Sequence, residues 1–286
     1  MEKISQSVVK KDHAPKVSGR SIYVSDYPSE GVLCGKLLHA KVARAKVLRV
    51  EVPELPEGYF YVDAKDVPGD NNVNIVLDDT PVFCRETVEY IGEPIAMICG
   101  PDTKKVEELR DACKVIYEEL EPVLDLRTAT ERFFDYNFGH GDVDKAFAEA
   151  DKIYDEEFET GYQEQAYLEV QGMMAEPEEN GRMFVHGSSQ CAYYIHGAVM
   201  RVLGCGPSGV HILQDVTGGG FGGKEAFPSI LGCQVAVAAN KCKKPVRCVF
   251  DRREDMEYTS KRHPSLCRYH CLLHWGRERG ADEVEK

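Results

Sequence analysis

Residues 210–240 read VHILQDVTGGGFGGKEAFPSILGCQVAVAAN and combine three kinds of local structure in one stretch. The apolar run VHILQDV has the composition of a strand. Five glycines follow between Gly218 and Gly223, and apolar residues then predict a long helix from about Lys224 to Asn240. Glycine lets a backbone approach a ligand closely and adopt positive φ angles. The unpaired N–H groups at the start of the helix would favour an anion beside the loop.

Three interpretations of this loop compete. The G-x-G-x-x-G spacing of Gly218–Gly223 fits a dinucleotide-binding loop. Such a loop normally lies near the N-terminus, in a βαβ unit whose second strand ends in an acidic residue. Here the candidate acidic residue is Asp251, which lies rather far beyond the glycine loop. A P-loop is excluded because Lys224 is followed by Glu225 rather than Ser or Thr. A tight turn that binds no ligand is the third interpretation, since glycine clusters are common in turns.

The region before residue 125 alternates short strand-like runs with turns. Residues 87–100, TVEYIGEPIAMICG, read as two strands around a turn, and AMIC is apolar enough for a central position in a sheet. A helix is predicted over Thr103–Cys113, with Asp102 or Thr103 as its cap. The strand KVIYEEL follows directly. Strands, a helix and a further strand predict a compact α+β domain.

The hydrophobic pattern fades after this domain, and we expect a linker over residues 129–141. Asp142 would then cap a short helix over Val143–Ala150. From there strands and helices alternate up to the region of the glycine loop. The sequence therefore predicts one domain over residues 1–128 and a second over residues 142–286.

Composition limits the classes of function. The chain has 286 residues, 43% of them hydrophobic, and a net charge of -13. This acidity argues against binding to nucleic acid, whose phosphates it would repel. No apolar run approaches the roughly 18 residues of a membrane span, and the N-terminus lacks the apolar core of a signal peptide. The eleven cysteines contain no CxxC pair, so we expect reduced thiols and a cytoplasmic protein.

Four ordered segments resemble the xanthine dehydrogenase/aldehyde oxidase family of molybdenum hydroxylases. They are GYQEQAYLEVQGMMAEP at 161–177, GSSQCAYYIHGAVMRVLG at 187–204, GGGFGGKE at 218–225 and FDRREDMEYTSKRHP at 250–264. The front part, from PKVSGRSIYVSD to VIYEELEPVLDLRTA, resembles the a/b hammerhead domain of that family. The resemblance implies an α+β fold, in which a hammerhead domain precedes the first, incomplete part of a molybdopterin-binding domain.

The resemblance also assigns the cofactor-binding residues. The amide of Gln190 would hydrogen-bond an oxo ligand of molybdenum, and a neutral amide donor suits that role. Gly220, Phe221 and Gly222 would bring the loop backbone to the cofactor, with N–H groups of Phe221 and Gly222 directed at it. The alternative for Gln190 is a cap on the helix that begins near Cys191.

Glu225 would face the substrate, because purine-hydroxylating relatives have a carboxylate at this position. Its alternative role is a favourable contact with the dipole of the following helix. Gln165 and Ser189 differ from the residues common in the family, and they leave the subfamily open. The nine histidines form no metal-binding pattern, so we expect no direct protein ligand to the metal.

After Tyr269 the family pattern fades, and residues 271–286 read as an atypical tail of the kind that an altered reading frame would produce. The resemblance places the general base in a complementing C-terminal half, so we expect no catalytic residue here and no activity from the chain alone. The complete enzyme would hydroxylate purine-type N-heterocycles with oxygen from water. It would use molybdenum–molybdopterin, in which a dinucleotide form of the pterin is one option, and iron–sulfur and FAD subunits. A non-catalytic truncated remnant or structural subunit and a nucleotide-binding dehydrogenase are the alternatives.

Overall fold

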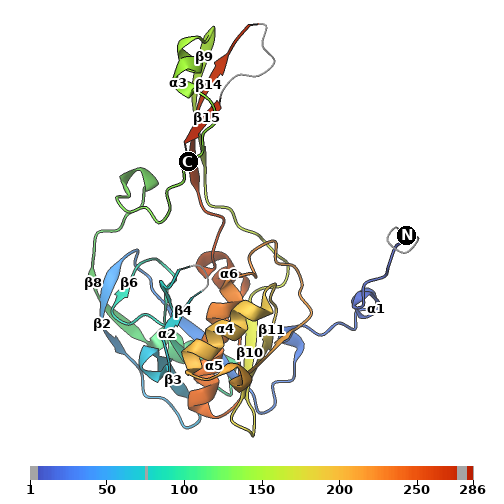
Figure 1. The fold of residues 1–286 in the computed structure, drawn as a ribbon. Helices are drawn as coiled ribbons and strands as arrows, with labels where there is room; N and C mark the ends of the chain where they lie inside the picture. Colours follow the sequence, from blue (N-terminus) through green and yellow to red (C-terminus); the bar gives the residue numbers. More distant parts are fainter. Residues whose placement is uncertain (1–5, 75–76, 276–281, 286) are drawn as a thin grey trace. The chain divides into compact units, whose positions relative to one another are not determined.

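The chain forms two compact units, which Figure 1 shows as a ribbon. The computed structural model describes residues 6–74, 77–275 and 282–285. Unit 1 consists of Met1–Pro122 and Ala166–Ser260, and unit 2 consists of Val123–Gln165 and Lys261–Lys286. The expected division placed one domain before residue 129 and a second after residue 141. The observed units differ from it, because strands from both halves of the sequence share one sheet.

That sheet has seven strands in the order β12-β11-β10-β13-β1-β7-β3. The strands are β1 (Leu33–His39), β3 (Phe60–Asp63), β7 (Pro94–Gly100), β10 (Gly172–Pro177), β11 (Met183–Gly187), β12 (Val210–Gln214) and β13 (Val246–Val249). β1 and β13 are parallel, with Leu33 beside Val246, while β1 and β7 are antiparallel. Every residue of β7 is buried, as predicted for a central strand.

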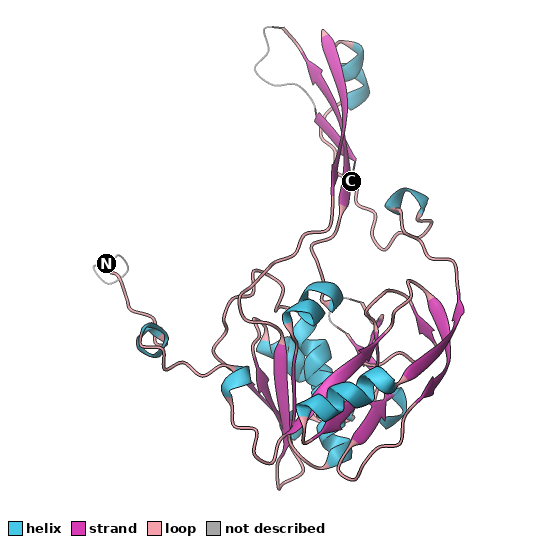
Figure 2. Ribbon diagram, turned by 180° about the vertical axis from the view of Figure 1, so that it is seen from behind, coloured by secondary structure: helices cyan, strands magenta, loops and turns pink. Residues whose placement is uncertain are grey.

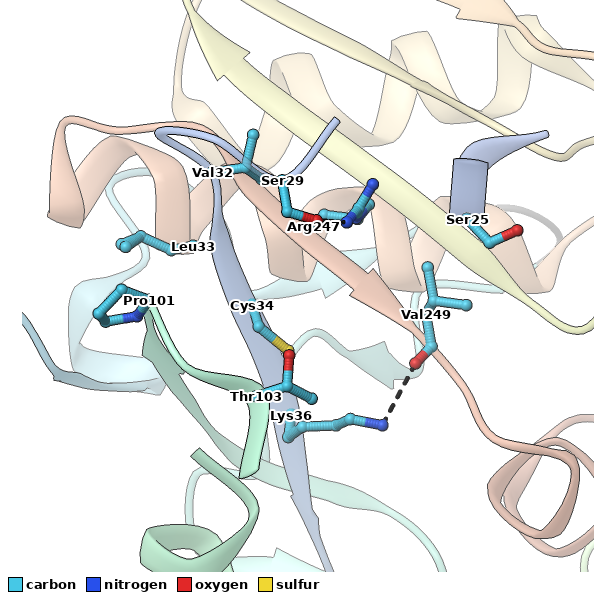
Figure 3. A pocket seen from close by; sticks show the side chains of 10 residues that line it. All are labelled: Ser25, Ser29, Val32, Leu33, Cys34, Lys36, Pro101, Thr103, Arg247 and Val249. Carbon is cyan, nitrogen blue, oxygen red and sulfur yellow. Dashed lines mark hydrogen bonds between the residues drawn. The ribbon is translucent and has the colours of Figure 1, made fainter. Parts of the chain in front are cut away.

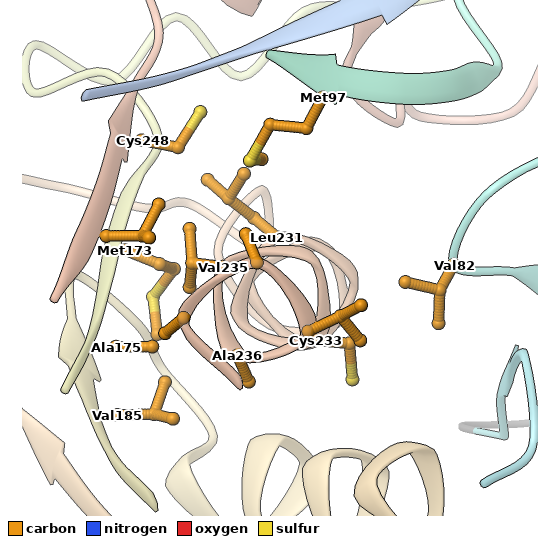
Figure 4. Packing of buried hydrophobic residues seen from close by; sticks show 14 of the residues in the cluster. Val82, Met97, Met173, Ala175, Val185, Leu231, Cys233, Val235, Ala236 and Cys248 are labelled. Atoms are coloured by element: carbon orange, nitrogen blue, oxygen red, sulfur yellow. The ribbon is translucent and has the colours of Figure 1, made fainter. Parts of the chain in front are cut away.

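Helix α5 (Phe227–Cys242) lies at the centre of the main core. It is apolar on all sides, as expected of a helix that is buried all round. Figure 4 shows Met173, Val185 and Cys248 from the sheet gathered around it. The second helix of this layer, α4 (Ala192–Leu203), packs against α5 and β12. It ends at Gly204 in the left-handed conformation, which glycine adopts readily.

The other face of β1 and β7 is covered by α2 (Thr103–Ala112). Its cap is Asp102, whose side chain accepts a hydrogen bond from the Lys105 N–H, which confirms the predicted start. Val106 and Leu109 pack here with Ile98 of the sheet.

Smaller elements complete unit 1, and Figure 2 distinguishes its helices from its strands. A three-stranded sheet contains β6 (Thr87–Val88), β2 (Ala45–Glu51) and β8 (Lys114–Glu119), and a two-stranded sheet contains β4 (Asn72–Val73) and β5 (Thr80–Pro81). The short helices are α1 (His13–Val17), η1 (Val24–Asp26), η2 (Ala64–Asp66), η4 (Pro207–Gly209) and α6 (Arg252–Tyr258). Helices and strands mix throughout, so the predicted α+β class is confirmed.

Unit 2 contains a three-stranded antiparallel sheet in the order β15-β14-β9. Its elements are η3 (Leu126–Thr128), α3 (Val143–Ala148), β9 (Lys152–Thr160), β14 (Ser265–Leu273) and β15 (Asp282–Glu285). Asp142 caps α3 by accepting from the Lys145 N–H, as predicted. Residues 129–141 contain neither helix nor strand and are exposed.

The parts of the tail, residues 271–286, that the structure describes form strands, and the expectation of an atypical tail stays a prediction. Cys271–Leu273 continue β14, and β15 pairs with Arg268–Cys271 through backbone hydrogen bonds. Strand pairing depends on backbone groups as well as on composition, so an unusual sequence can still form a hairpin. Residues 276–281 and 286 of that tail lie outside the described part of the chain.

His39 at the end of β1 is expected to make the stability of unit 1 depend on pH. Its Nδ1 lies 2.7 Å from the carbonyl oxygen of Gly92, and its ring stacks on Tyr258 at 4.1 Å. Burial lowers the pKa of His39 from 6.5 to about 4. Between these values the unfolded chain binds a proton that the folded chain does not bind. The contribution of His39 to stability is therefore complete above pH 6.5, and we expect this contribution to fall by about 3 kcal/mol as the pH drops to 4.

The matched variant is His39→Asn, because an Asn amide can donate to Gly92 but does not titrate in this range. Urea unfolding at pH 7, 5.5 and 4 should show a loss of stability that is about 3 kcal/mol smaller in the variant than in the parent chain. Equal pH slopes in both proteins would contradict this role of His39.

Candidate functional site

The glycine loop connects β12 to α5 and has an unusual backbone. Gly219 and Gly222 have φ angles of 101° and 90°, and Phe221 has 51°. Positive φ is costly for a residue with a side chain, so the loop holds Phe221 in a strained position. The side chain of Phe221 is 80% exposed.

Gln190, at the end of the segment after β11, is bonded directly to the loop. Its Oε1 accepts hydrogen bonds from the N–H groups of Gly222 at 3.1 Å and Lys224 at 3.2 Å. The Gln190 N–H donates to the Lys224 carbonyl at 2.7 Å. A Cβ added to Gly220 would lie 2.5 Å from Gln190 Oε1, so the absence of a side chain there gives Gln190 its space. Three of the predicted cofactor-binding residues, Gln190, Gly220 and Gly222, therefore meet.

Two expectations about these residues need correction. Gln190 does not cap α4: the cap position is Cys191, and no side chain there bonds the helix. The Gly222 N–H is donated to Gln190, so it is not left for a cofactor. Both outcomes follow from the hydrogen bonds that Gln190 Oε1 accepts from the Gly222 and Lys224 N–H groups of the loop.

The observed first residue of α5 also differs from the predicted one, which was about Lys224. The helix begins at Phe227, with Pro228 in its first turn and Ala226 at the cap position. The residues before it form tight turns, in which Gly223 N–H bonds Gly220 and Glu225 N–H bonds Gly222. The first N–H groups of the helix therefore lie beyond the glycine loop.

Beneath the loop lies a buried ion pair that the sequence did not reveal. The Nζ of Lys224 lies 2.9 Å from Glu169 Oε2 and 2.9 Å from the Ser188 hydroxyl. The same carboxylate oxygen accepts from the Ser188 hydroxyl and from the Gly218 N–H, both at 2.6 Å. Burial lowers the pKa of Lys224, while the neighbouring Glu169 opposes this shift. Both residues occur in the motifs that resemble the family, but neither motif indicates that they would pair.

A second layer of polar contacts supports this pair from below. Gln171 Nε2 donates to the Gly223 carbonyl at 2.7 Å and to the Tyr167 hydroxyl at 2.8 Å. Tyr167 OH in turn donates to Asp255 at 3.1 Å, and Asp255 binds Arg252 at 3.0 Å. Desolvation raises the pKa of Tyr167, which keeps its hydroxyl protonated as a donor. The motif around residues 250–264 thus supports the loop through α6.

Glu225 lies at the open side of the loop. Its side chain is exposed, and in the described part of the chain its carboxylate has no hydrogen-bond or ion-pair partner. It precedes α5, whose first turn contains no acidic residue, so the proposed contact with the helix dipole is not formed. Phe221 in the loop and Leu168, whose backbone lies beside Gly219, are also strongly exposed. The loop therefore has one well-ordered side and one open side.

The topology argues against the dinucleotide-binding interpretation. In a dinucleotide-binding βαβ unit, the strand before the loop and the strand after the helix lie next to each other. Here these strands are β12 and β13, and β11 and β10 separate them. The nucleotide-binding dehydrogenase is therefore not supported.

A cavity of about 190 Å³ lies elsewhere in unit 1, where residues of the neighbouring strands β1 and β13 line it together with Ser25, Ser29, Val32, Pro101 and Thr103 (Figure 3). It contains the Cys34 thiol and the cationic groups of Lys36 and Arg247, but none of the predicted site residues lines it. Both cations have partners, since Lys36 contacts Glu254 and Arg247 donates to Ser29.

In the described residues, no cluster of His, Cys, Asp and Glu could hold a metal ion. No helix among them is long and apolar enough to cross a membrane.

Comparison with known families gives two consecutive matches. The molybdopterin cofactor-binding domain matches residues 126–273. The a/b hammerhead domain of aldehyde oxidase and xanthine dehydrogenase matches residues 18–121. The chain belongs to the aldehyde oxidase and xanthine dehydrogenase family. The predicted order of a hammerhead domain and a molybdopterin-binding domain is confirmed, and the match continues past Tyr269 to Leu273.

Relatives in this family are much longer than the chain. It is 35% identical to the xanthine dehydrogenase/oxidase of Gallus gallus over 275 residues, which are 93% of the chain and 20% of that protein. It is 29% identical to a probable xanthine dehydrogenase subunit of Bacillus subtilis over 90% of the chain and 36% of that protein. The aldehyde oxidoreductase of Desulfovibrio gigas has the same fold, with a TM-score of 0.81, 23% identity and coverage of 92% of the chain and 32% of that protein.

Gly220→Ala tests the arrangement of this family's loop in the chain. The added methyl group would displace Gln190, so the Gly222 N–H would lose its acceptor. We expect hydrogen exchange at Gly222 to accelerate by about tenfold or more, because its N–H loses the hydrogen bond that protects it. The control is Gly206→Ala, where the added methyl group meets nothing within 4 Å. Similar exchange at Gly222 in both variants would contradict the arrangement.

Proposed function

We propose that the chain forms one wall of the cofactor site in a xanthine dehydrogenase-like hydroxylase that oxidises purine-type N-heterocycles with oxygen from water. The observation that carries this proposal is the orientation of Gln190. Its carbonyl end is bound by two N–H groups of the loop, so its amide N–H₂ is the end that remains for a ligand.

The residues present fit a molybdopterin-held metal. The cofactor's oxygen ligands are acceptors, and Gln190 offers a neutral donor beside a backbone that lacks side chains at Gly219 and Gly220. Gln190, Gly220 and Phe221 would hold the cofactor, while Gly222 would act through Gln190. When bound, the cofactor would supply the two-electron oxidation and the transfer of oxygen. The chain's own residues would bind and orient it.

Partners are part of the proposal. Two exposed apolar side chains, those of Phe221 in the loop and of Leu168 beside Gly219, support a complementing C-terminal half that covers the loop and supplies the general base. The chain's limited coverage of its relatives supports the same interpretation. Iron–sulfur and FAD subunits would carry the electrons away, and the relative in Bacillus subtilis is itself named as one subunit. Free thiols such as those of Cys99 and Cys233 suit the reducing cytoplasm, where we place the protein.

Cofactor analysis tests this assignment. The chain purified alone should contain little molybdenum or pterin, because the open side leaves half of the site unformed. Co-expression with a complementing large-subunit half and with iron–sulfur and FAD subunits should give about one molybdenum per complex. Gln190→Ala should lower that content, whereas Glu179→Ala, at an exposed turn, should not.

Two outcomes would decide against the proposal. Stoichiometric molybdenum in the chain alone would show that no second wall is needed. A stable complex without molybdenum or pterin would favour the alternative, a non-catalytic remnant or structural subunit.

Glu225 is the residue that we propose selects the substrate. It directly follows the loop and has an unpartnered, exposed carboxylate, which can hydrogen-bond ring N–H groups of a purine once the site is closed. In the assembled enzyme, Glu225→Val should lower kcat/KM for purines by on the order of 10²-fold. Aldehydes lack these N–H groups, so their oxidation should change much less.

The matched control is Glu179→Val, which removes an exposed carboxylate from a turn between β10 and β11. The ratio of purine to aldehyde turnover should stay constant in this variant. Equal losses on both substrates in Glu225→Val would mean that Glu225 supports the loop and does not select the substrate.

A further inference from the structure

Lys224 contacts the Gln190 end of the glycine loop through its backbone and the Gly218 end through its side chain. Its backbone N–H and carbonyl both bond Gln190, at 3.2 and 2.7 Å. Its Nζ bonds Glu169, which in turn accepts from the Gly218 N–H. Lys224 therefore connects Gln190 with the first glycine of the loop, and it does so without reaching the open side.

The charges of this pair depend on each other. The Lys224 side chain is fully buried, and that of Glu169 is 12% exposed. A buried ammonium or carboxylate without its partner is strongly unfavourable, so removal of either residue destabilises the other. The ring of Tyr167, 4.8 Å from the ammonium, adds a favourable contact for a cation. The pair can hold its position because Ser188 and Gly218 also donate to the same carboxylate oxygen.

The position of Lys224 determines which end of the Gln190 amide faces outward. The N–H groups of Gly222 and Lys224 both point at one side of the amide. Only the carbonyl oxygen can satisfy two donors, and a rotated amide would place its own N–H₂ against them. The outward-facing group is therefore a donor for as long as Lys224 remains in place.

We infer that Lys224 and Glu169 are positioning residues, which fix the Gln190 amide so that the loop offers a hydrogen-bond donor to an acceptor group of the cofactor. The inference deepens the proposed function and rests on it for the identity of the ligand. The positioning itself is a property of the chain alone. Neither residue touches the ligand in this arrangement, and both act through Gln190.

The test uses the full chain without cofactor, so its result does not depend on the proposed function. Lys224→Met should accelerate hydrogen exchange at Gly218 and Gly222 by about tenfold or more, because their acceptors lose their fixed positions. The side-chain amide signals of Gln190 in a ¹H–¹⁵N spectrum should shift or broaden as both amide orientations become populated. Lys46→Met, which removes an exposed ion pair with Glu118, should change neither measurement.

A double variant separates positioning from stability. Lys224→Met with Glu169→Gln removes both buried charges, so it should recover most of the thermal stability that Lys224→Met loses. Fast exchange at Gly222 and altered Gln190 signals should nevertheless persist, because the connection between the two ends of the loop is still missing. If the single variant does not fold, the double variant alone decides.

Two results would overturn the inference. One is a folded Lys224→Met or double variant whose Gly222 exchange and Gln190 signals match the parent chain. The other is a double variant in which loop order returns together with stability, since the pair would then act only on the fold. Parent complexes without molybdenum would instead contradict the proposed function and leave the loop measurements intact.

Discussion

The parallel pairing of β1 with β13 is the constraint on which the rest of unit 1 depends. These strands are about two hundred residues apart in the sequence, yet Leu33 and Val246 lie side by side in one sheet. Their pairing places β7 and β3 on one side and β10, β11 and β12 on the other. The result is a sheet wide enough to cover α5, whose residues are apolar on every side. A helix of this kind cannot be stable at a surface, so sheet and helix require each other.

The functional loop follows from this arrangement because it lies between an edge strand and the buried helix. β12 fixes the beginning of the loop and α5 fixes its end. Between them, Gln190 forms hydrogen bonds with the backbone of Lys224. The loop is thus ordered from one side by buried polar contacts. Its other side exposes aromatic and aliphatic side chains at Phe221 and Leu168. A preorganised donor next to an open apolar edge is the arrangement expected of one wall of a larger site.

Buried charge under the loop has a cost as well as a use. Lys224 and Glu169 would be less costly as apolar residues of similar size, since desolvation of two ions offsets much of their attraction. Such a pair makes sense where it controls geometry, and here it controls the glycine backbone through Gly218. Tyr167, Gln171 and Asp255 extend this control to α6, so the segment around residues 250–264 belongs to the support of the loop.

The sequence by itself determined the local elements and the family. The caps at Asp102 and Asp142 and the buried strand β7 followed from short-range patterns, because capping and periodicity depend on neighbouring residues. The glycine loop and the position of Gln190 were visible for the same reason. Only the tertiary structure decided which groups face each other. In the tertiary structure β1 pairs with β13, and α5 begins at Phe227. The Gly222 N–H donates to Gln190 rather than to a ligand, and Lys224 forms an ion pair with Glu169. Those contacts are made across 32 to more than 200 residues of sequence, and such distances are closed by packing and burial, which no local pattern encodes.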